Sequence, residues 1–281
     1  MANLFLRFPG NRHKALTFSY DDGPREDVRL IDLFRRLGLR ATFNLNSGSF
    51  PPEEKAGSKT FRLTKKEALD LYSGSGMEVA AHTLTHPRLE EMGAGLAAYE
   101  IMKDKENLEE MFGGFVSGIA YPYGTYSDEI VETVRNAGLI YARTIEPSYS
   151  FEIPKDWLRL KPTCHHGDER LMELAESFVS ADLTGRDRDP LLFYVWGHSF
   201  EFDERFGGTW DVIESFSSYV AGRNDIWYAT NGEIFEYIEA FNRLRFSTDR
   251  SYVRNESYIP VSFFYNEKDY TAAPGEVLIL D

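Results

Sequence analysis

The sequence predicts an α/β protein built on a parallel (β/α) barrel of about seven strands, with a short C-terminal β-rich extension. Two patterns carry this prediction. Short apolar runs typical of buried strands alternate with longer segments whose apolar residues recur at helical spacing. Polar side chains also collect directly after several predicted strands, and in a parallel barrel those strand ends share one face. A chain of 281 residues is long enough for one such barrel.

The predicted strands are short and apolar, and most are followed by a helical pattern. They cover residues 14–20, 41–46, 76–83, 117–124, 139–144, 157–163 and 191–197. The predicted helices cover residues 27–40, 63–74, 89–111, 127–138, 169–179, 210–222 and 233–244. Gly38 is typical of a helix end, and Thr64 with Glu67 three residues later forms a capping-box pattern.

The last part of the chain differs in character from the rest. Residues 1–244 carry the strand and helix alternation and are expected to form the barrel. Residues 245–281 are β-like without a helical pattern, so we expect a β extension packed on the barrel and not an independent domain. Residues 47–61 are expected to form a surface loop.

Composition argues against several classes of function. A net charge of −14 disfavours binding to nucleic-acid phosphates and to anionic membrane surfaces. No apolar run approaches the ~20 residues of a membrane span, and no signal-peptide pattern opens the sequence. The single cysteine, Cys164, excludes an intrachain disulfide and is expected to be a small buried residue. These features predict a cytoplasmic location, or an extracellular one if a leader has been trimmed from the sequence.

Polar residues that could carry chemistry follow several of the predicted strands. They are Asp21 and Asp22 after the first strand, His82 and His86 after the third, Tyr121 and Tyr123 after the fourth, His165 and His166 after the sixth, and His198 after the seventh. We expect them to meet on the face formed by the carboxyl ends of the strands.

The HTLTH segment places His82 and His86 four residues apart, and on one helical turn both rings would face a divalent metal together. Asp22 would complete a set of two histidines and one carboxylate that leaves room for water and substrate. Asp21, near the metal but off it, could take a proton from metal-bound water. Two simpler interpretations stay open: the histidines are unrelated polar residues, or Asp21 is a turn or helix-capping residue.

The segments SYDDGP, HTLTH, AYPYG and VWGH resemble, in order and spacing, the motifs of the polysaccharide deacetylase family. This family includes chitin deacetylases, peptidoglycan N-acetylglucosamine deacetylases and acetylxylan esterases. The matching segments run from Ser19 to His198. The resemblance implies a distorted (β/α) barrel and a metal-dependent hydrolase that removes acetyl groups from an N- or O-acetylated carbohydrate.

The resemblance also implies a role for each matching residue. It makes Asp21 the general base, His198 the general acid for the leaving amine or alcohol, and the backbone N–H of Tyr123 an oxyanion donor. It makes Asp22, His82 and His86 the ligands of a divalent metal, with Zn²⁺ as the default and Co²⁺, Ni²⁺ or Mn²⁺ as alternatives.

The chain departs from the family pattern mildly at Ser19 and Tyr20, where the first motif usually begins Thr-Phe, and more strongly in two later places. The third motif usually begins with an arginine that orients the catalytic aspartate, and Ala120 stands there. We expect an arginine from elsewhere to reach Asp21, with Arg143 the first candidate and Arg159 the second. The fourth motif has no clean counterpart, and residues 154–168 are expected to replace it.

Several residues near these motifs are assigned supporting or substrate-binding roles. They are Tyr121, Pro122, Trp157, His165, His166 and Trp196. Trp157 could form a substrate wall, although packing explains both tryptophans more simply. Because neighbouring side chains on a strand point apart, we expect only one of the two adjacent histidines to reach the site.

Two alternatives to a carbohydrate deacetylase remain at this level. The same residues could cleave another C–N bond in a small non-polysaccharide amide. An inactive barrel that binds sugar is the second alternative, and the complete set of acidic and histidine residues argues against it. The expected partner is an acetylated saccharide, with no nucleic acid and no membrane span, and the sequence does not determine the oligomeric state.

Overall fold

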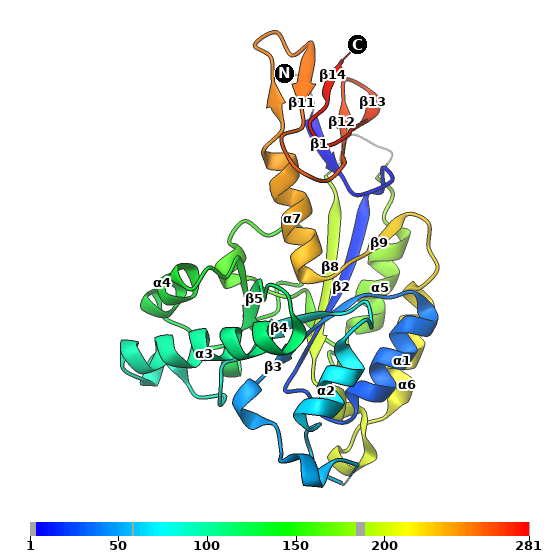
Figure 1. The fold of residues 1–281 in the computed structure, drawn as a ribbon. Coiled ribbons are helices and arrows are strands. Elements are labelled where there is room, and N and C mark those ends of the chain that lie inside the picture. The colour runs from blue at the N-terminus through cyan, green and yellow to red at the C-terminus, as the bar shows by residue number, and fades with distance from the viewer. Residues whose placement is uncertain (1–3, 58, 184–188, 281) are drawn as a thin grey trace.

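The structure is a computed structural model that describes residues 4–57, 59–183 and 189–280. Its central strands are β2 (Lys14–Asp21), β3 (Ala41–Leu45), β4 (Glu78–Ala81), β5 (Gly118–Ala120), β6 (Tyr141–Arg143), β7 (Cys164–His165), β8 (Leu191–Gly197) and β9 (Ile226–Tyr228). They form one curled parallel sheet in the order β6–β5–β4–β3–β2–β8–β7, and β9 pairs with the start of β2 (Figure 1). The predicted α/β class and distorted barrel are confirmed.

The α-helices follow the strands along the chain. They are α1 (Asp27–Leu37), α2 (Lys65–Tyr72), α3 (Ala94–Phe112), α4 (Asp128–Asn136), α5 (Leu171–Ser180), α6 (Trp210–Val220) and α7 (Asn231–Asn242). Gly38, with a φ of 69°, ends α1 as predicted. The predicted capping box is also present, because Thr64 and Glu67 bond each other's backbone amides at the start of α2.

The helix predicted from residue 89 begins later. Leu89–Glu91 form a short 3₁₀ turn, and Met92 and Gly93 are extended. The apolar spacing continues through both parts, so periodicity alone did not reveal the break. Gly93 is the N-cap of α3, with an extended φ of −66° and ψ of 143°.

The two edges of the sheet approach each other through residues 160–165. Leu160 donates its amide to the Ala142 carbonyl at 2.9 Å and accepts from the Thr144 amide at 2.9 Å, beside β6. Thr163 then donates to the Tyr194 carbonyl of β8 at 2.8 Å. The strand predicted over 157–163 is therefore wrong in its bounds, because residues 157–159 form a 3₁₀ turn and β7 starts at Cys164.

Aromatic side chains fill the space between the sheet and the helices on one side of it. Phe18 of β2 packs on Phe34 of α1 with ring centroids 4.5 Å apart, and on Phe216 of α6 at 5.9 Å. Phe193 of β8 packs on Phe178 of α5 at 5.3 Å. These buried rings anchor the middle of β2 and β8, so the residues at the carboxyl ends of both strands start from fixed positions.

The extension consists of two small antiparallel sheets. Their strands are β1 (Leu4–Arg7), β10 (Arg245–Phe246), β11 (Tyr252–Arg254), β12 (Val261–Tyr265), β13 (Lys268–Ala272) and β14 (Val277–Ile279). One sheet has the order β1–β12–β13 and the other β10–β11–β14, so a strand from before the barrel joins strands from after it. Figure 1 shows this part at the end of the barrel where β2 begins, away from the carboxyl ends of the strands.

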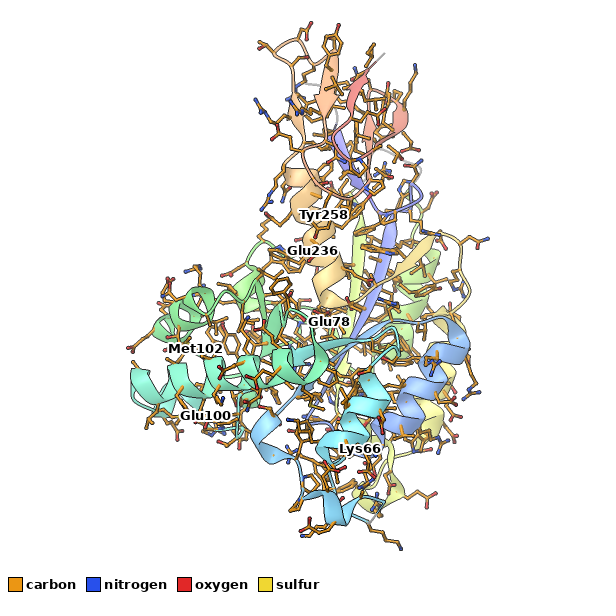
Figure 2. All side chains as sticks on the ribbon, viewed as in Figure 1. Lys66, Glu78, Glu100, Met102, Glu236 and Tyr258 are labelled. Atoms are coloured by element: carbon orange, nitrogen blue, oxygen red, sulfur yellow. The ribbon has the colours of Figure 1, made fainter. Side chains whose placement is uncertain are left out.

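The helix α7 connects the extension to the barrel. Tyr258 Oη donates to Glu236 Oε2 of α7 at 2.8 Å, and Figure 2 shows the two side chains close together. At the other end of α7, the amide of Gly232 donates to Glu78 Oε2 of β4 at 2.9 Å. No helix among the described residues is long and apolar enough to cross a membrane.

Candidate active site

Asp21 ends β2 and lies buried at the carboxyl edge of the sheet. Arg143, the last residue of β6, forms an ion pair with Asp21 Oδ2, and Asn44 Nδ2 donates to Asp21 Oδ1 at 2.8 Å. Burial alone would raise the pKa of Asp21, but the Arg143 guanidinium, helped by His82 and His198, outweighs burial, so the pKa lies below its usual value. Asp21 is therefore an oriented carboxylate that is ionised at neutral pH.

Asp22 begins a turn directly after the strand. Its φ of 76° is a left-handed conformation that residues other than glycine adopt infrequently. Arg62 Nη2 donates to Asp22 Oδ1 at 2.7 Å, and Arg62 Nε donates to the Asp22 carbonyl at 2.9 Å. Arg62 was not among the expected site residues, and its contact with a residue 40 positions earlier carries no sequence signal.

The segment from His82 to His86 is an irregular turn and not the helical turn predicted from its spacing. Thr83 and His86 have φ values of 66° and 64°, outside the range of a right-handed helix. Glu100 and Asp104 of α3 hold the turn by accepting backbone amides from it at 2.8 and 2.9 Å. The two imidazoles still meet, with ring centroids 4.7 Å apart.

The hydrogen bonding of His82 leaves one ring nitrogen available. His82 Nδ1 lies 2.8 Å from the Ala120 carbonyl, so this nitrogen carries the proton and Nε2 has a free lone pair. Burial lowers the pKa of His82 to about 4, so the ring is neutral. Donor atoms of Asp22, His82 and His86, here called the ligand group, lie within 4.8 Å of one another. Two imidazoles and a carboxylate fit a divalent metal such as zinc.

Tyr123 lies beside the ligand group. It adopts a φ of 58° and a ψ of 5°, and its ring packs on His86 with centroids 4.6 Å apart. No hydrogen bond described for residues 4–57, 59–183 and 189–280 uses its backbone N–H. Tyr121 and Pro122 are buried, and Tyr121 Oη donates to the Leu158 carbonyl at 2.9 Å, so both hold the turn that presents Tyr123.

His198 follows β8 and reaches the same carboxylate oxygen of Asp21 as His82. The Nε2 atoms of His198 and His82 each lie 3.9 Å from Asp21 Oδ2. Burial would lower the pKa of His198, but the negative charges of Glu201 and Asp21 outweigh it and raise the pKa above its ordinary value. His198 thus favours the protonated form that a general acid needs.

A second cluster of polar residues lies next to His198. Glu201 Oε2 lies 3.0 Å from His165 Nε2 and 3.1 Å from His166 Nε2. Both neighbouring histidines therefore contact one carboxylate, although the alternation of side chains on a strand predicted that only one of them would reach the site. The strand ends at His165, so the alternation of side chains does not extend to His166.

Glu201 was missed in the sequence. A signal was present, because Glu201 stands three residues after His198, at the spacing of a capping box. The amide of His198 donates to Glu201 Oε2 at 3.1 Å, as that pattern predicts. Donor atoms of His165, His198 and Glu201, here called the Glu201 group, also lie within 4.8 Å of one another.

Other expected site residues lie elsewhere or have packing contacts. Arg159 pairs with Asp128 at 2.6 Å and with Asp156 at 2.8 Å, so of the two candidate arginines Arg143 is the one beside Asp21. Trp157 packs edge-on against Phe235 of α7 with centroids 5.2 Å apart, as the simpler packing interpretation expects.

Trp196 and Cys164 lie on the strands that carry the Glu201 group. The Trp196 ring lies 4.5 Å from the Arg143 guanidinium carbon and 4.8 Å from the ring centroid of His165. It therefore packs against the groups that hold Asp21 and Glu201. Cys164 is buried, and burial raises the pKa of its thiol to about 12, so it is an inert packing residue as expected.

Comparison with known proteins finds similar chains among polysaccharide deacetylases. The family model for polysaccharide deacetylase matches residues 9–142. A chitooligosaccharide deacetylase from Azorhizobium caulinodans is 29% identical over 146 residues, which cover 51% of this chain and 61% of that protein. A second chitooligosaccharide deacetylase, from Sinorhizobium fredii, is 25% identical and is covered over 63% of its length. The chain thus spans about three fifths of these curated relatives.

Solved structures with the same fold extend the likeness to most of the chain. A protein from Mycobacterium smegmatis classed among the polysaccharide deacetylases gives a TM-score of 0.60 at 15% identity, covering 86% of this chain and 96% of that one. A family 4 carbohydrate esterase from Streptomyces lividans, solved with acetate, gives 0.50 at 16% identity, covering 78% and 92%. At these identities the likeness concerns the fold.

Proposed function

The chain belongs to the polysaccharide deacetylase family, and from that premise we propose that it is a metal-dependent hydrolase that removes acetyl groups from an N- or O-acetylated carbohydrate. One observation carries the proposal. Asp21 Oδ2 lies 3.9 Å from His82 Nε2 of the ligand group and 3.9 Å from His198 Nε2. A candidate base thereby lies at the same distance from a candidate metal ligand and from a candidate acid, an arrangement that supports acyl-transfer hydrolysis.

The ligand group would hold the metal. Its neutral His82 ring, with Nδ1 engaged by a backbone carbonyl, is prepared to bind through Nε2, and Asp22 and His86 supply the other donors. When bound, a divalent metal polarises the acetyl carbonyl and lowers the pKa of water. The Arg62 guanidinium, which contacts Asp22 Oδ1, keeps that carboxylate oriented beside the two imidazoles.

The remaining steps belong to the side chains and backbone around the ligand group. Asp21, ionised and oriented by Arg143 and Asn44, accepts the proton of the attacking water. The Tyr123 amide donates to the developing oxyanion. His198 gives its proton to the departing nitrogen or oxygen. In this scheme Arg143 takes the place of the arginine that the family motif has at the position of Ala120.

A substrate panel with acetate detection tests the proposal. The purified chain, supplied with Zn²⁺, is incubated with acetylated chito-oligosaccharide, acetylated xylan and a small cyclic amide. Acetate release from either saccharide is the expected result, and Asp21→Asn should reduce it by about 10²–10⁴-fold while metal content stays unchanged. Cleavage of the cyclic amide alone, or normal turnover by Asp21→Asn, would overturn the assignment.

A further inference from the structure

Glu201 is the meeting point of residues from two strand ends. Its carboxylate receives the His165 and His166 rings from the end of β7 and the backbone amide of His198 from the end of β8. The fourth contact is His198 Nδ1, which lies 3.3 Å from Glu201 Oε1, a charge contact that is not aligned as a hydrogen bond in this structure. One third of the Glu201 side chain is exposed, Oε2 is occupied by the two rings and the amide, and Oε1 faces His198 Nδ1.

The ring of His165 can act toward Glu201 only as a hydrogen-bond donor. The amide of Gly167 donates to His165 Nδ1 at 3.0 Å, so Nδ1 must present its lone pair. In a neutral ring the proton is then on Nε2, the atom that lies 3.0 Å from Glu201 Oε2. A metal at the Glu201 group would need the lone pair of that same Nε2, which the bond from Gly167 excludes.

The ring of His166 has the same orientation toward Glu201. It is buried, stacks on Tyr20 with centroids 5.7 Å apart, and burial lowers its pKa to about 4. Among the described residues no group hydrogen-bonds to His166 Nδ1, which faces the backbone of Gly197. An unpartnered buried N–H costs more than an unpartnered lone pair, so the proton of this neutral ring lies on Nε2, toward Glu201.

We propose that Glu201 is a positioning residue for His198, held in place by His165 and His166. The two neutral rings fix Oε2, the same oxygen accepts the His198 amide, and Oε1 faces His198 Nδ1. The opposite ring nitrogen, Nε2, is thereby directed at Asp21 and the reacting groups. This inference rests on the proposed function, because it assigns His198 the transfer of a proton to the leaving group.

The charged and titratable groups that face His198 come from several elements. Asp21 and Asp22 face it from the end of β2, Glu201 from the following 3₁₀ turn, and His165 and His166 from the end of β7. Glu201 is distinct among the acidic groups because it contacts the Nδ1 side of the ring. Its removal should therefore change the ring's orientation and its proton, while the carboxylate on the Nε2 side stays in place.

The test compares Glu201→Gln with Glu204→Gln, a matched variant that removes the same charge from an exposed residue three positions later. We expect Glu201→Gln to lower kcat by about 10²-fold, with KM for the acetylated saccharide and Zn²⁺ content within about twofold. The alkaline limb of the pH profile should move to lower pH. In ¹⁵N-edited NMR of the histidine rings, the His198 Nδ1 proton signal should shift or vanish. Glu204→Gln should leave all five measurements unchanged.

A second pair of variants examines the support of Glu201. His165→Gln keeps an N–H donor near the position of Nε2, whereas His165→Ala removes it. The alanine variant should lose part of kcat, by about tenfold, and the glutamine variant should restore most of it. Thermal unfolding of each variant separates this effect from loss of fold.

Three outcomes would overturn the inference. One is an unchanged kcat together with an unchanged His198 ring signal in Glu201→Gln. Another is a fall in kcat that His165→Gln and His165→Ala do not distinguish. The last is a second equivalent of bound Zn²⁺ that Glu201→Gln abolishes, which would make the Glu201 group a metal site. If the wild-type chain releases no acetate, the proposed function fails, and the NMR comparison still decides whether Glu201 orients His198.

Discussion

The ligand group and the Glu201 group look alike as lists of residues. Each contains histidine and one carboxylate, and in each the donor atoms lie within 4.8 Å of one another. They differ in where the ring protons are held. The Ala120 carbonyl accepts from His82 Nδ1 and frees Nε2, whereas the Gly167 amide donates to His165 Nδ1 and places the proton on Nε2.

This difference shows that the backbone group bonded to Nδ1 of a histidine determines how its Nε2 can act. A carbonyl at Nδ1 keeps the proton there and leaves Nε2 free to bind a metal. An amide at Nδ1 places the proton on Nε2, which then acts as a hydrogen-bond donor. Asp21 lies close to both groups, at 3.9 Å from His82 Nε2 and from His198 Nε2, which gives the contrast a consequence. The ligand group is suited to hold a cation beside Asp21, and the Glu201 group is suited to hold a protonated ring there.

The strongest way to break the comparison is to remove one histidine from each group. His82→Ala should reduce Zn²⁺ content from about one per chain to below about a tenth, because a two-donor site binds zinc far more weakly. Deacetylation should fall by about 10³-fold or more with it. Metal analysis of the purified variant, alongside the acetate assay, measures both.

His165→Ala is the counterpart in the Glu201 group. It should keep its full Zn²⁺ content, because the proton on His165 Nε2 makes this ring a donor to Glu201 and not a ligand. Equal losses of metal in the two variants would remove the distinction between the groups.

A second prediction concerns the ion pair that holds Asp21 between the groups. Arg143 and Asp21 are both buried, so Arg143→Met leaves an uncompensated buried carboxylate. Removing one partner of a buried pair costs about 3–5 kcal/mol of unfolding free energy, which urea denaturation measures. Arg159→Met is the control, because the pairs of Arg159 are partly exposed and should contribute less than about 1 kcal/mol each. Similar losses in the two variants would contradict the structural role of Arg143.

A smaller effect should come from the buried carboxyl group beneath the Glu201 group. Asp27 accepts hydrogen bonds from Ser199 and Tyr72 at 2.5 Å each, and burial raises its pKa to about 7. Between about pH 4 and pH 7 the folded chain holds a proton that the unfolded chain has lost, so this group lowers stability as pH rises through that range. Asp27→Asn removes the titration.

Between pH 5 and pH 7 the wild type should therefore lose roughly 2–3 kcal/mol of unfolding free energy that Asp27→Asn does not lose. Urea titrations at several pH values measure the difference. Asp32→Asn, at an exposed residue of α1, should show a pH-independent difference. If the difference in unfolding free energy between Asp27→Asn and the wild type is also independent of pH, Asp27 is already ionised in the folded chain.

Much of the fold could be predicted because it depends on local patterns. The alternation of apolar runs with helical spacing marked the barrel, and Gly38 and Thr64 marked helix ends through backbone chemistry that acts within a few residues. The residues of the ligand group, Asp21 and His198 were found because parallel strands bring their carboxyl ends together.

The rest depends on contacts that local patterns do not encode. The backbone of Thr83 and His86 is left-handed, so a four-residue spacing that suggested a helical turn produced an irregular one. Glu201 reaches His165 because the chain turns back into a 3₁₀ segment after β8, and neither residue signals the other in sequence. The strands β1 and β9 were not predicted, since each is short and is defined by its pairing partner.

The pairing of β1 with β12 has a consequence for the order of folding. The strand Leu4–Arg7 pairs with residues 262–265, so the barrel segment of the chain lies in sequence between the two strands of one antiparallel pair. Loop-closure entropy makes such a contact slow to form before the intervening chain is compact. We expect the barrel to condense first and the β1–β12 pairing to be the last step, so hydrogen exchange should protect β2 and β8 before the amides of β1.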